Sequence, residues 1–321
     1  MSIVAQQGAG TGELRSRLNL LIIAACIVAA LVAPFVHYPI DLMNVLCFAL
    51  FASAFNLLIG FVGLLSFGHA AFFGAAAYVT AHAAKVWGLP PELAILLGAL
   101  AAGALGLVVG FLAIRRQGIY FSMITLALAQ MFYFVCLEVP FTHGEDGIQG
   151  VPRGTLLGLV NLDNNLAFYF VVLAIVAAGH FAIWRIVHSP FGNILKAIRD
   201  NEPRAISLGY NVDSYKLRAF VLSAGLAGLA GGTHAIVYQL ATLTDVEWQA
   251  SGQVILMTLL GGIGTLAGPP IGAAIVVLLQ TNLAALDFPV TVLIGLIFVV
   301  CVLLFRRGVA GEIIAYMRKR G

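Results

Sequence analysis

The chain carries very little charge. Only 10% of its 321 residues are Asp, Glu, Lys or Arg, whereas an ordinary soluble domain has about 25%. Hydrophobic residues make up 61% of the chain, and its mean hydropathy is +1.01. One globular core cannot bury so much apolar surface, so lipid must cover part of it. The composition therefore excludes an ordinary soluble protein and predicts an all-α, polytopic membrane protein.

Sequence motifs for enzymatic chemistry are also missing. No G-x-x-x-x-G-K-[ST] run occurs, so the chain lacks the phosphate-binding loop that holds ATP in many ATPases. The hydrolase motifs H-E-x-x-H and G-x-S-x-G do not occur either. The four cysteines lie in apolar runs and form no C-x-x-C pair. We therefore expect no enzyme activity, cofactor, metal or nucleic-acid partner for this chain, and any ATP must bind a separate polypeptide.

Acidic residues do not occur near the middle of the apolar runs. Ionisable side chains inside a bilayer are costly and usually functional, and a proton-coupled carrier normally needs such a carboxylate. This pattern disfavours an ATP-independent secondary carrier or channel, which remains open as an alternative.

Apolar runs between polar breaks predict the membrane segments. The first run, 18–36, follows a polar tail at 1–17. It exceeds the apolar core of about 7–15 residues in a signal peptide, so we interpret it as a retained span. The further predicted spans are 42–62, 64–84, 92–114, 119–139, 165–187 and 217–241.

The basic residues predict the orientation, because Lys and Arg are enriched in cytoplasmic loops. With the amino terminus inside, the loop 188–216 lies in the cytoplasm and the loop 140–164 lies outside. Only Lys85 and Arg153 of the 17 Lys and Arg residues then lie outside. This strong bias supports the assigned orientation.

The membrane domain, 18–305, ends before a basic tail, 306–321, which the same rule places in the cytoplasm. That placement requires three crossings, or one re-entrant hairpin and one crossing, between 253 and 305. The predicted break is the glycine- and proline-rich stretch Gly261–Pro270, which either lies near the protein interior or forms a short cytoplasmic turn. The chain should then contain about ten membrane or re-entrant helical segments, with both termini in the cytoplasm.

Small residues repeat at helical spacing inside two predicted spans. They are Gly98, Ala102, Gly106 and Gly110 in one span and Ala224, Gly228 and Gly232 in the other. Such ladders allow helices to approach closely in a membrane. We interpret both ladders as helix-packing surfaces, with a face toward a substrate path as the alternative.

One polar interruption, Ser189–Arg218, holds five basic residues between long apolar runs. Asn193–Asp200 has a helix-forming composition. Pro203 suits the first turn of a second short helix, and Gly209 should stop it. The interruption therefore predicts a helix, a kink and a short helix on the cytoplasmic surface, which either docks a partner or contacts only lipid headgroups.

Four separated blocks resemble one transporter family. They are GLLSFGHAAFFGAAAYVTA from Gly63, THGEDGIQGVPRG from Thr142, LKAIRDNEPRAISLGYNVDSYKLRAFVLSAGLAGLAGG from Leu195 and GGIGTLAGPPIGA from Gly261. Together they resemble permease subunits of branched-chain amino acid ABC importers, of the LivM type rather than the LivH type. The likeness covers nearly the whole chain from about residue 40. One departure is His143, where the family usually has glycine, and a histidine disfavours left-handed backbone there.

The resemblance implies an importer subunit of the bacterial inner membrane. Its implied substrates are branched-chain or other small neutral amino acids, with urea or amides as the alternative. Its implied partners are a homologous second permease, two ATPase subunits that hold the ATP, and an extracytoplasmic binding protein that meets the acidic loop 140–164. The family's coupling helix implies ATPase contacts at Ile198, Arg199, Asp200, Asn201, Glu202, Ala205, Leu208 and Gly209.

A translocation path should use polar or flexible positions inside the spans. The candidates are Asn56, Ser66, His69, Ser122, Thr125, Gln130 and Gly264. A hydrogen bond between helices is the alternative role for the polar candidates, and for His69 a structural role is the preferred interpretation.

Overall fold

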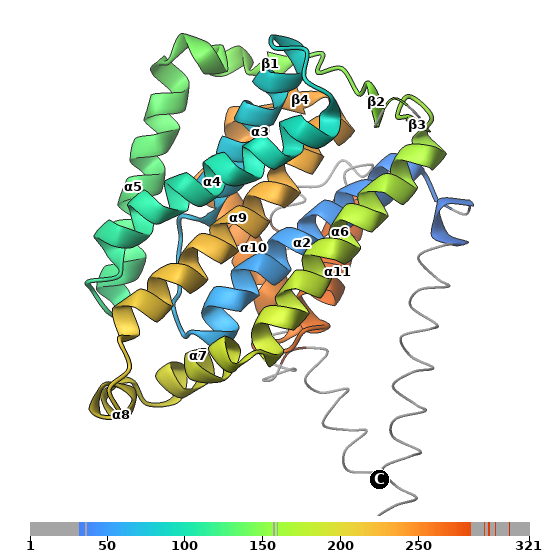
Figure 1. The fold of residues 1–321 in the computed structure, drawn as a ribbon. Coiled ribbons are helices and arrows are strands. Elements are labelled where there is room, and N and C mark those ends of the chain that lie inside the picture. Colours follow the sequence, from blue (N-terminus) through green and yellow to red (C-terminus); the bar gives the residue numbers. More distant parts are fainter. Residues whose placement is uncertain are drawn as a thin grey trace, which may run out of the picture.

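The computed structural model describes residues 32–35, 37–156, 158 and 160–283, together with 292, 295, 299 and 308. Those residues form a bundle of α-helices with two small pieces of sheet at one end (Figure 1). The predicted tail 1–17, most of the predicted first span 18–36, and nearly all of 284–321 lie outside the described residues.

Within the described residues, five helices are long and apolar enough to cross a membrane. They are α2 (Pro39–Phe61), α4 (Pro91–Ala113), α5 (Ile119–Glu138), α6 (Asn165–His188) and α9 (Val212–Tyr238). Each overlaps one of the predicted spans. Both α2 and α4 begin with a proline in the first turn, where the missing N–H is not needed for a helix bond. The chain is therefore a polytopic, α-helical membrane protein, as the composition predicts.

The helices α2, α3 (His69–Lys85) and α9 make up the centre of the bundle. Of the most apolar stretches of α2 and α9, 67% and 72% are buried, whereas those of α4, α5 and α6 are only about one-third buried. Most side chains of α3 are also buried. The outer helices therefore present the apolar surface that lipid covers.

The two small-residue ladders pack helices together. The contact between α4 and α9 is the most extensive among the described helices. A Cβ added to Gly106 would overlap the Cβ of Ala224, and one added to Gly228 would overlap the Cβ of Ala102. The packing interpretation of these ladders is confirmed.

The predicted span 64–84 is wrong at its start, because the helix begins only at His69. Gly63 has φ 84°, and the chain between it and His69 is not helical. A Cβ at Gly68 would lie 2.8 Å from the backbone oxygen of Thr125, so this close approach requires glycine.

The predicted glycine- and proline-rich break is present. It separates α10 (Trp248–Gly261) from α11 (Gly268–Leu283), which pack against each other. The 14 residues of α10 span about 21 Å, less than the bilayer's hydrocarbon core of about 30 Å, and 16 residues of α11 lie within the described part of the chain. Both helices also pack against α2.

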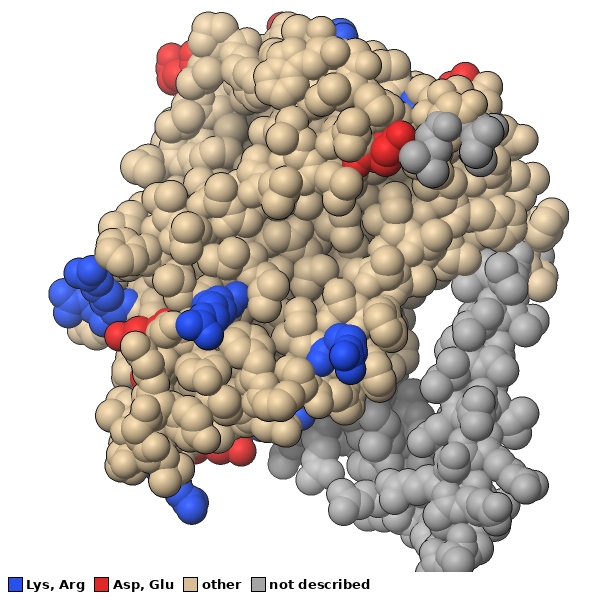
Figure 2. All heavy atoms as spheres, viewed as in Figure 1, with Lys and Arg blue, Asp and Glu red and all other residues tan. Residues whose placement is uncertain are grey.

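The two ends of the bundle differ in structure and charge. One end carries α7 (Pro190–Asp200) and α8 (Glu202–Ser207), and basic side chains gather toward it on the face shown in Figure 2. We call it the basic end. The opposite end carries the antiparallel strand pairs β1 (Ile148–Gln149) with β4 (Leu240–Ala241) and β2 (Thr155–Leu156) with β3 (Val160–Asn161). The short helices η1 (Ala33–Phe35), η2 (Pro140–Thr142), η3 (Gly144–Asp146) and η4 (Leu243–Asp245) complete the described elements.

Two hydrogen bonds from Arg153 hold the loop 140–164 at the end opposite α7. The Arg153 guanidinium donates to Asn165 Oδ1 at 2.7 Å and to the Val237 carbonyl at 2.8 Å. These bonds join the loop to the beginning of α6 and the end of α9.

The expectation that His143 disfavours left-handed backbone is wrong, since this residue has φ 63° and ψ 21° in the turn that ends η2.

Candidate coupling site and intramembrane helix breaks

Local signals in the sequence determine the course of α7. Ser189 caps its start by accepting a hydrogen bond from the Gly192 N–H at 3.3 Å, and Pro190 occupies the first turn. The helix therefore begins three residues before the predicted start at Asn193. The buried side chains of Leu195 and Ile198 anchor α7 to the rest of the chain.

The predicted kink and second helix are present in α8. Asn201 ends α7 and caps α8, because its Oδ1 accepts a hydrogen bond from the Arg204 N–H at 3.0 Å. Pro203 lies in the first turn. Gly209 has φ 87°, a left-handed conformation that stops the helix as the sequence predicts.

The carboxylate of Glu202 faces its own chain. Its Oε1 lies 2.6 Å from Lys216 Nζ in α9 and accepts a second hydrogen bond from Gln117 Nε2 at 2.9 Å. The Lys216 side chain is only 3% exposed and that of Glu202 is 21% exposed. This ion pair connects α8 to α9 and to the segment between α4 and α5.

The guanidinium of Arg199 also faces its own chain. Its Nη1 donates to the Gly60 carbonyl at the end of α2. Its Nη2 and Nε donate to Asp200 Oδ1 at 3.0 and 3.2 Å. One side chain thus joins α7 to a membrane helix.

The predicted ATPase contacts divide into inward and outward groups. Ile198 and Ala205 are buried beside Val212, so a direct contact between them and a partner is not compatible with this structure. Asp200, Asn201, Leu208 and Gly209 are exposed. The sequence interpretation missed two exposed apolar side chains, Ile206 and Tyr210, which flank Leu208. An apolar residue at every second position in Ile206–Tyr210 was the available signal.

The first helix break enters the interior of the bundle. After α2 ends at Phe61, the non-helical residues 63–68 lead to His69 at the start of α3. The imidazole of His69 bonds to Ser223 Oγ, which donates to the Ala54 carbonyl at 2.6 Å. Ala54 lies seven residues before the end of α2, which corresponds to about 10 Å along the helix. The first turn of α3 therefore begins deep inside the protein.

Hydroxyl groups from two other helices and the segment itself satisfy the backbone of this break. The bonds run from Ser122 Oγ to the Leu65 carbonyl (2.7 Å), from the Phe67 N–H to Thr125 Oγ1 (3.2 Å), from the Gly68 N–H to Ser66 Oγ (3.2 Å) and from the Ala70 N–H to Ser251 Oγ (2.9 Å). Irregular backbone at membrane depth needs such internal partners. The predicted path residues Ser66, Ser122 and Thr125 thus lie together, bonded to the backbone of the break.

His69 has the surroundings of a structural residue. Its Nε2 lies 2.9 Å from Ser223 Oγ, and the side chain is fully buried. The rings of Phe55, Phe72 and Phe220 surround it edge-on, with centroid distances of 5.1 to 6.0 Å. These contacts agree with the structural interpretation preferred from the sequence.

The second helix break, at 262–267, meets the end of α2. Asn56 Oδ1 accepts a hydrogen bond from the Gly264 N–H at 2.9 Å, and Asn56 Nδ2 donates to the Thr265 carbonyl at 2.8 Å. Gly264 has φ 75°. The structure thus brings together the predicted path residues Asn56 and Gly264, while Gln130 lies elsewhere on α5.

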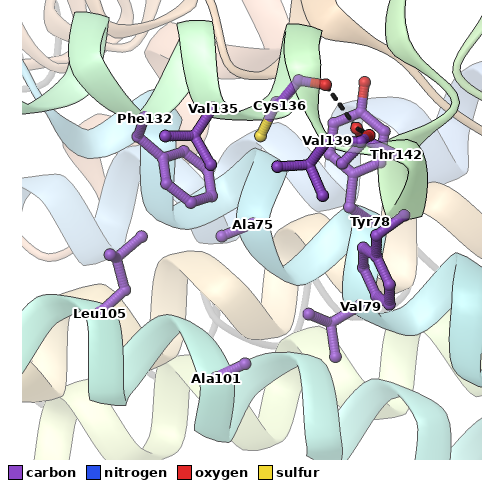
Figure 3. Close-up of a pocket in the computed structure, with 11 residues that line it drawn as sticks. Ala75, Tyr78, Val79, Ala101, Leu105, Phe132, Val135, Cys136, Val139 and Thr142 are labelled. Carbon is purple, nitrogen blue, oxygen red and sulfur yellow. Dashed lines mark hydrogen bonds between the residues drawn. The ribbon is translucent and has the colours of Figure 1, made fainter.

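An apolar cavity of about 250 Å³ lies between α3, α4 and α5 (Figure 3). Ala75, Tyr78, Leu105, Phe132 and Val135 are among its lining residues. Thr142 also contributes to it, but its hydroxyl bonds to the carbonyls of Cys136 and Val139. None of the predicted path residues, all of which the structure describes, lines this cavity.

Comparison with known proteins identifies the family. A family model described as "Branched-chain amino acid transport system / permease component" matches residues 40–305. The chain belongs to this permease family. A permease component is a transport protein and not an enzyme, so the chain is not itself an enzyme. The match extends over α2 to α11, and therefore over both helix breaks and over α7 and α8.

Curated relatives of this permease differ in their stated roles. The high-affinity branched-chain amino acid transport system permease protein LivM of Escherichia coli is 27% identical over 271 residues, 76% of this chain and 64% of the relative. The inner membrane ABC transporter permease protein YjfF of the same organism is 34% identical over 61% of this chain and 60% of its own length. The autoinducer 2 import system permease protein LsrC of Salmonella typhimurium is 28% identical over 59% of this chain and 56% of its own length.

The matched part of this permease thus spans slightly less than two-thirds of the length of the LivM relatives. No solved structure matches the chain.

Proposed function

We propose that this permease carries branched-chain or other small neutral amino acids into the bacterial cytoplasm as the membrane subunit of an ABC importer. Separate ATPase subunits would bind and hydrolyse the ATP. The similarity to LivM supports the substrate class. The similarity to YjfF, an inner membrane permease protein, supports the inner membrane as the location.

Three exposed apolar side chains, one in α8 and two in the turn after it, are the observation that carries this proposal. Ile206 is 57% exposed, Leu208 67% and Tyr210 40%. They belong to α8 and the turn after it at the basic end, rather than to the long apolar helices that face lipid. An exposed apolar patch with a polar rim is typical of a protein interaction site. An ATPase subunit is the partner that an ABC permease without a phosphate-binding loop requires.

The proposed topology places the basic end in the cytoplasm, together with both termini, and gives about ten membrane or re-entrant segments. The opposite loop, 140–164, would then meet an extracytoplasmic binding protein. A second, homologous permease would complete the membrane part. The concentration of basic side chains around α7 and α8 supports this orientation.

The proposed mechanism transmits ATP-driven movement through the 193–209 segment. Closure of the ATPases would displace α7 and α8 and move the membrane helices between outward and inward access. The predicted path residues at the breaks 63–68 and 262–267 are hydrogen-bonded to backbone in this conformation. A shift of either break would free those polar atoms for a substrate.

The alternative substrate class within this function is urea or amides. The name of LsrC, which refers to autoinducer 2 import, indicates that sequences similar to this permease serve unrelated solutes. The binding protein would set the choice among them.

Reconstitution tests the proposal. The permease, its companion permease, the ATPase subunits and the binding protein are placed in proteoliposomes, and uptake of labelled leucine, urea and acetamide is measured with and without ATP inside. We expect leucine uptake that depends on ATP, on the binding protein and on the ATPase subunits. Uptake by the permease alone, driven by an ion gradient, would overturn the ABC assignment in favour of a secondary carrier.

A further inference from the structure

The guanidinium of Arg199 lies where three separate segments meet. It donates to the Gly60 carbonyl in the last turn of α2. Its stem packs on the turn at Gly63, where an added Cβ would lie 3.0 Å from Arg199 Cγ. An added Cβ at Gly264 would lie 3.6 Å from Arg199 Nη1. One side chain of α7 therefore lies beside both the entrance to the first helix break and the turn of the second.

The two breaks are also joined to each other at this point. Asn56 holds Gly264 and Thr265 through both atoms of its amide. A Cβ at Gly60 would lie 2.6 Å from the Gly264 nitrogen, so no larger residue fits between α2 and the second break. The end of α2 and the 262–267 turn should therefore move together.

The hydrogen bond from Arg199 satisfies a backbone carbonyl at the end of α2, where few other donors are available. The last carbonyls of a helix have no intrahelical donor. Here the Leu58 carbonyl accepts from the N–H groups of Val62, Gly63 and Leu64, and the Gly60 carbonyl accepts from Arg199. A hydrogen bond from a charged donor is roughly twice as strong as a neutral one. A displacement of α7 must consequently move the Gly60 carbonyl or break this bond.

We propose that Arg199 is a positioning residue that transmits the displacement of α7 to the helix breaks at 63–68 and 262–267. The proposal rests on the proposed function, in which an ATPase acts on α7 and α8. The first break leads directly to His69 and the buried first turn of α3. Movement received at Arg199 thus reaches the centre of the bundle without any contact between the ATPase and that region.

This role differs from the docking contact that the sequence predicts for Arg199. A docking residue would be needed for the complex to assemble. A transmitting residue can be lost while assembly and ATP hydrolysis continue, because its effect is on the amount of substrate moved for each ATP hydrolysed. That ratio separates the two roles.

The test uses the complete complex in proteoliposomes with Arg199→Gln. Arg218→Gln is the matched control, since Arg218 is an exposed arginine of the basic end that lies over the Tyr215 ring at 5.8 Å. Co-purified ATPase, ATP hydrolysis and substrate imported per ATP are measured. We expect Arg199→Gln to assemble and hydrolyse ATP, with import per ATP lowered about tenfold, which is the scale for the loss of one charged hydrogen bond.

Arg218→Gln should keep the parental ratio. Arg199→Lys retains a charged donor for the Gly60 carbonyl but lacks the forked geometry, so it should recover most of the lost import per ATP. A parental ratio in Arg199→Gln would overturn the proposal. Loss of co-purified ATPase in Arg199→Gln from an otherwise folded permease would also overturn it, because it would assign Arg199 to docking.

If Arg199→Gln does not fold, the variant Gly264→Ala tests the proposal instead. The added methyl would lie 3.3 Å from the Gly60 carbonyl and 3.6 Å from Arg199 Nη1, at a position with φ 75°. Gly252→Ala is its control, since a Cβ there meets nothing within 4 Å. A lowered import per ATP in Gly264→Ala alone supports the proposal, and an unchanged ratio overturns it. Failure of the proposed function would look different, because the parental complex itself would then import nothing with ATP.

Discussion

The ion pair between Lys216 and Glu202 should hold α8 in place, and Lys216→Met tests this. The two side chains are joined at 2.6 Å, and that of Lys216 is 3% exposed. Methionine preserves most of the apolar stem while removing the charge. The Glu202 carboxylate then keeps only the neutral donor Gln117 among its observed partners.

The expected magnitude follows from the burial of the pair. Removal of one partner from a fully buried pair costs about 3–5 kcal/mol. Because Glu202 is 21% exposed and keeps one hydrogen bond, we expect about 1–3 kcal/mol, the cost of leaving a buried polar group poorly paired. This free energy acts on the local opening of α8 rather than on the whole bundle, since α8 is a short helix at the end of the molecule.

Limited trypsin digestion at Arg204, which is exposed in α8, measures this opening. A loss of 1–3 kcal/mol should raise the cleavage rate about 5- to 150-fold when opening is fast relative to cleavage. In the double variant Lys216→Met with Glu202→Met, no unpaired charge remains, so the cleavage rate should return toward the parental value. A parental rate in the single variant, or a double variant cleaved as fast as the single one, would refute the reasoning.

Three further variants test other parts of the structure. Thr125→Val leaves a backbone N–H of the first break unpaired and should destabilise the solubilised permease by about 1–3 kcal/mol in thermal unfolding. The control Gln130→Leu on the same helix should cost less than about 1 kcal/mol. Equal effects of the two variants would contradict the assigned bond. Arg153→Gln removes two bonds that fasten the loop 140–164, so hydrogen exchange across 151–156 should accelerate, and unchanged protection would count against that clamp. Gly106→Ala should separate α4 from α9 and lower the yield of folded protein, because its Cβ would overlap the Cβ of Ala224, while Gly103→Ala, whose Cβ has its nearest atom at 4.0 Å, should not.

Most membrane helices were predictable because a long apolar run bounded by polar residues has only one stable form in lipid. The kink at Asn201 and Pro203 was predictable for a similar reason, since capping and proline effects act within a few residues. The packing of the small-residue ladders also followed from local spacing, since Gly106 and Gly228 lie where two helices approach closely.

The first helix break was not predictable from local signals. Residues 63–68 continue an apolar run, and their glycines look like those of a packing surface. Their non-helical backbone depends on hydroxyl groups from distant parts of the chain, Ser122, Thr125 and Ser251. The orientation of the Arg199 and Glu202 side chains was not predictable for the same reason. Their partners include Gly60 and Lys216, which only the fold brings near. Charge on a surface helix therefore did not reveal which side chains face a partner.

The central claim is that an ATPase subunit docks on the exposed apolar side chains of α8 and the turn after it. The most direct measurement is co-purification of the ATPase subunits with the double variant Ile206→Asp and Leu208→Asp. Val86→Asp is the control, since Val86 is 58% exposed just beyond the end of α3, away from α8. We predict that the double variant folds but loses the ATPase, with at least about 30-fold weaker binding, as for interface hot spots, while Val86→Asp retains it. Parental ATPase recovery with the double variant would contradict the account.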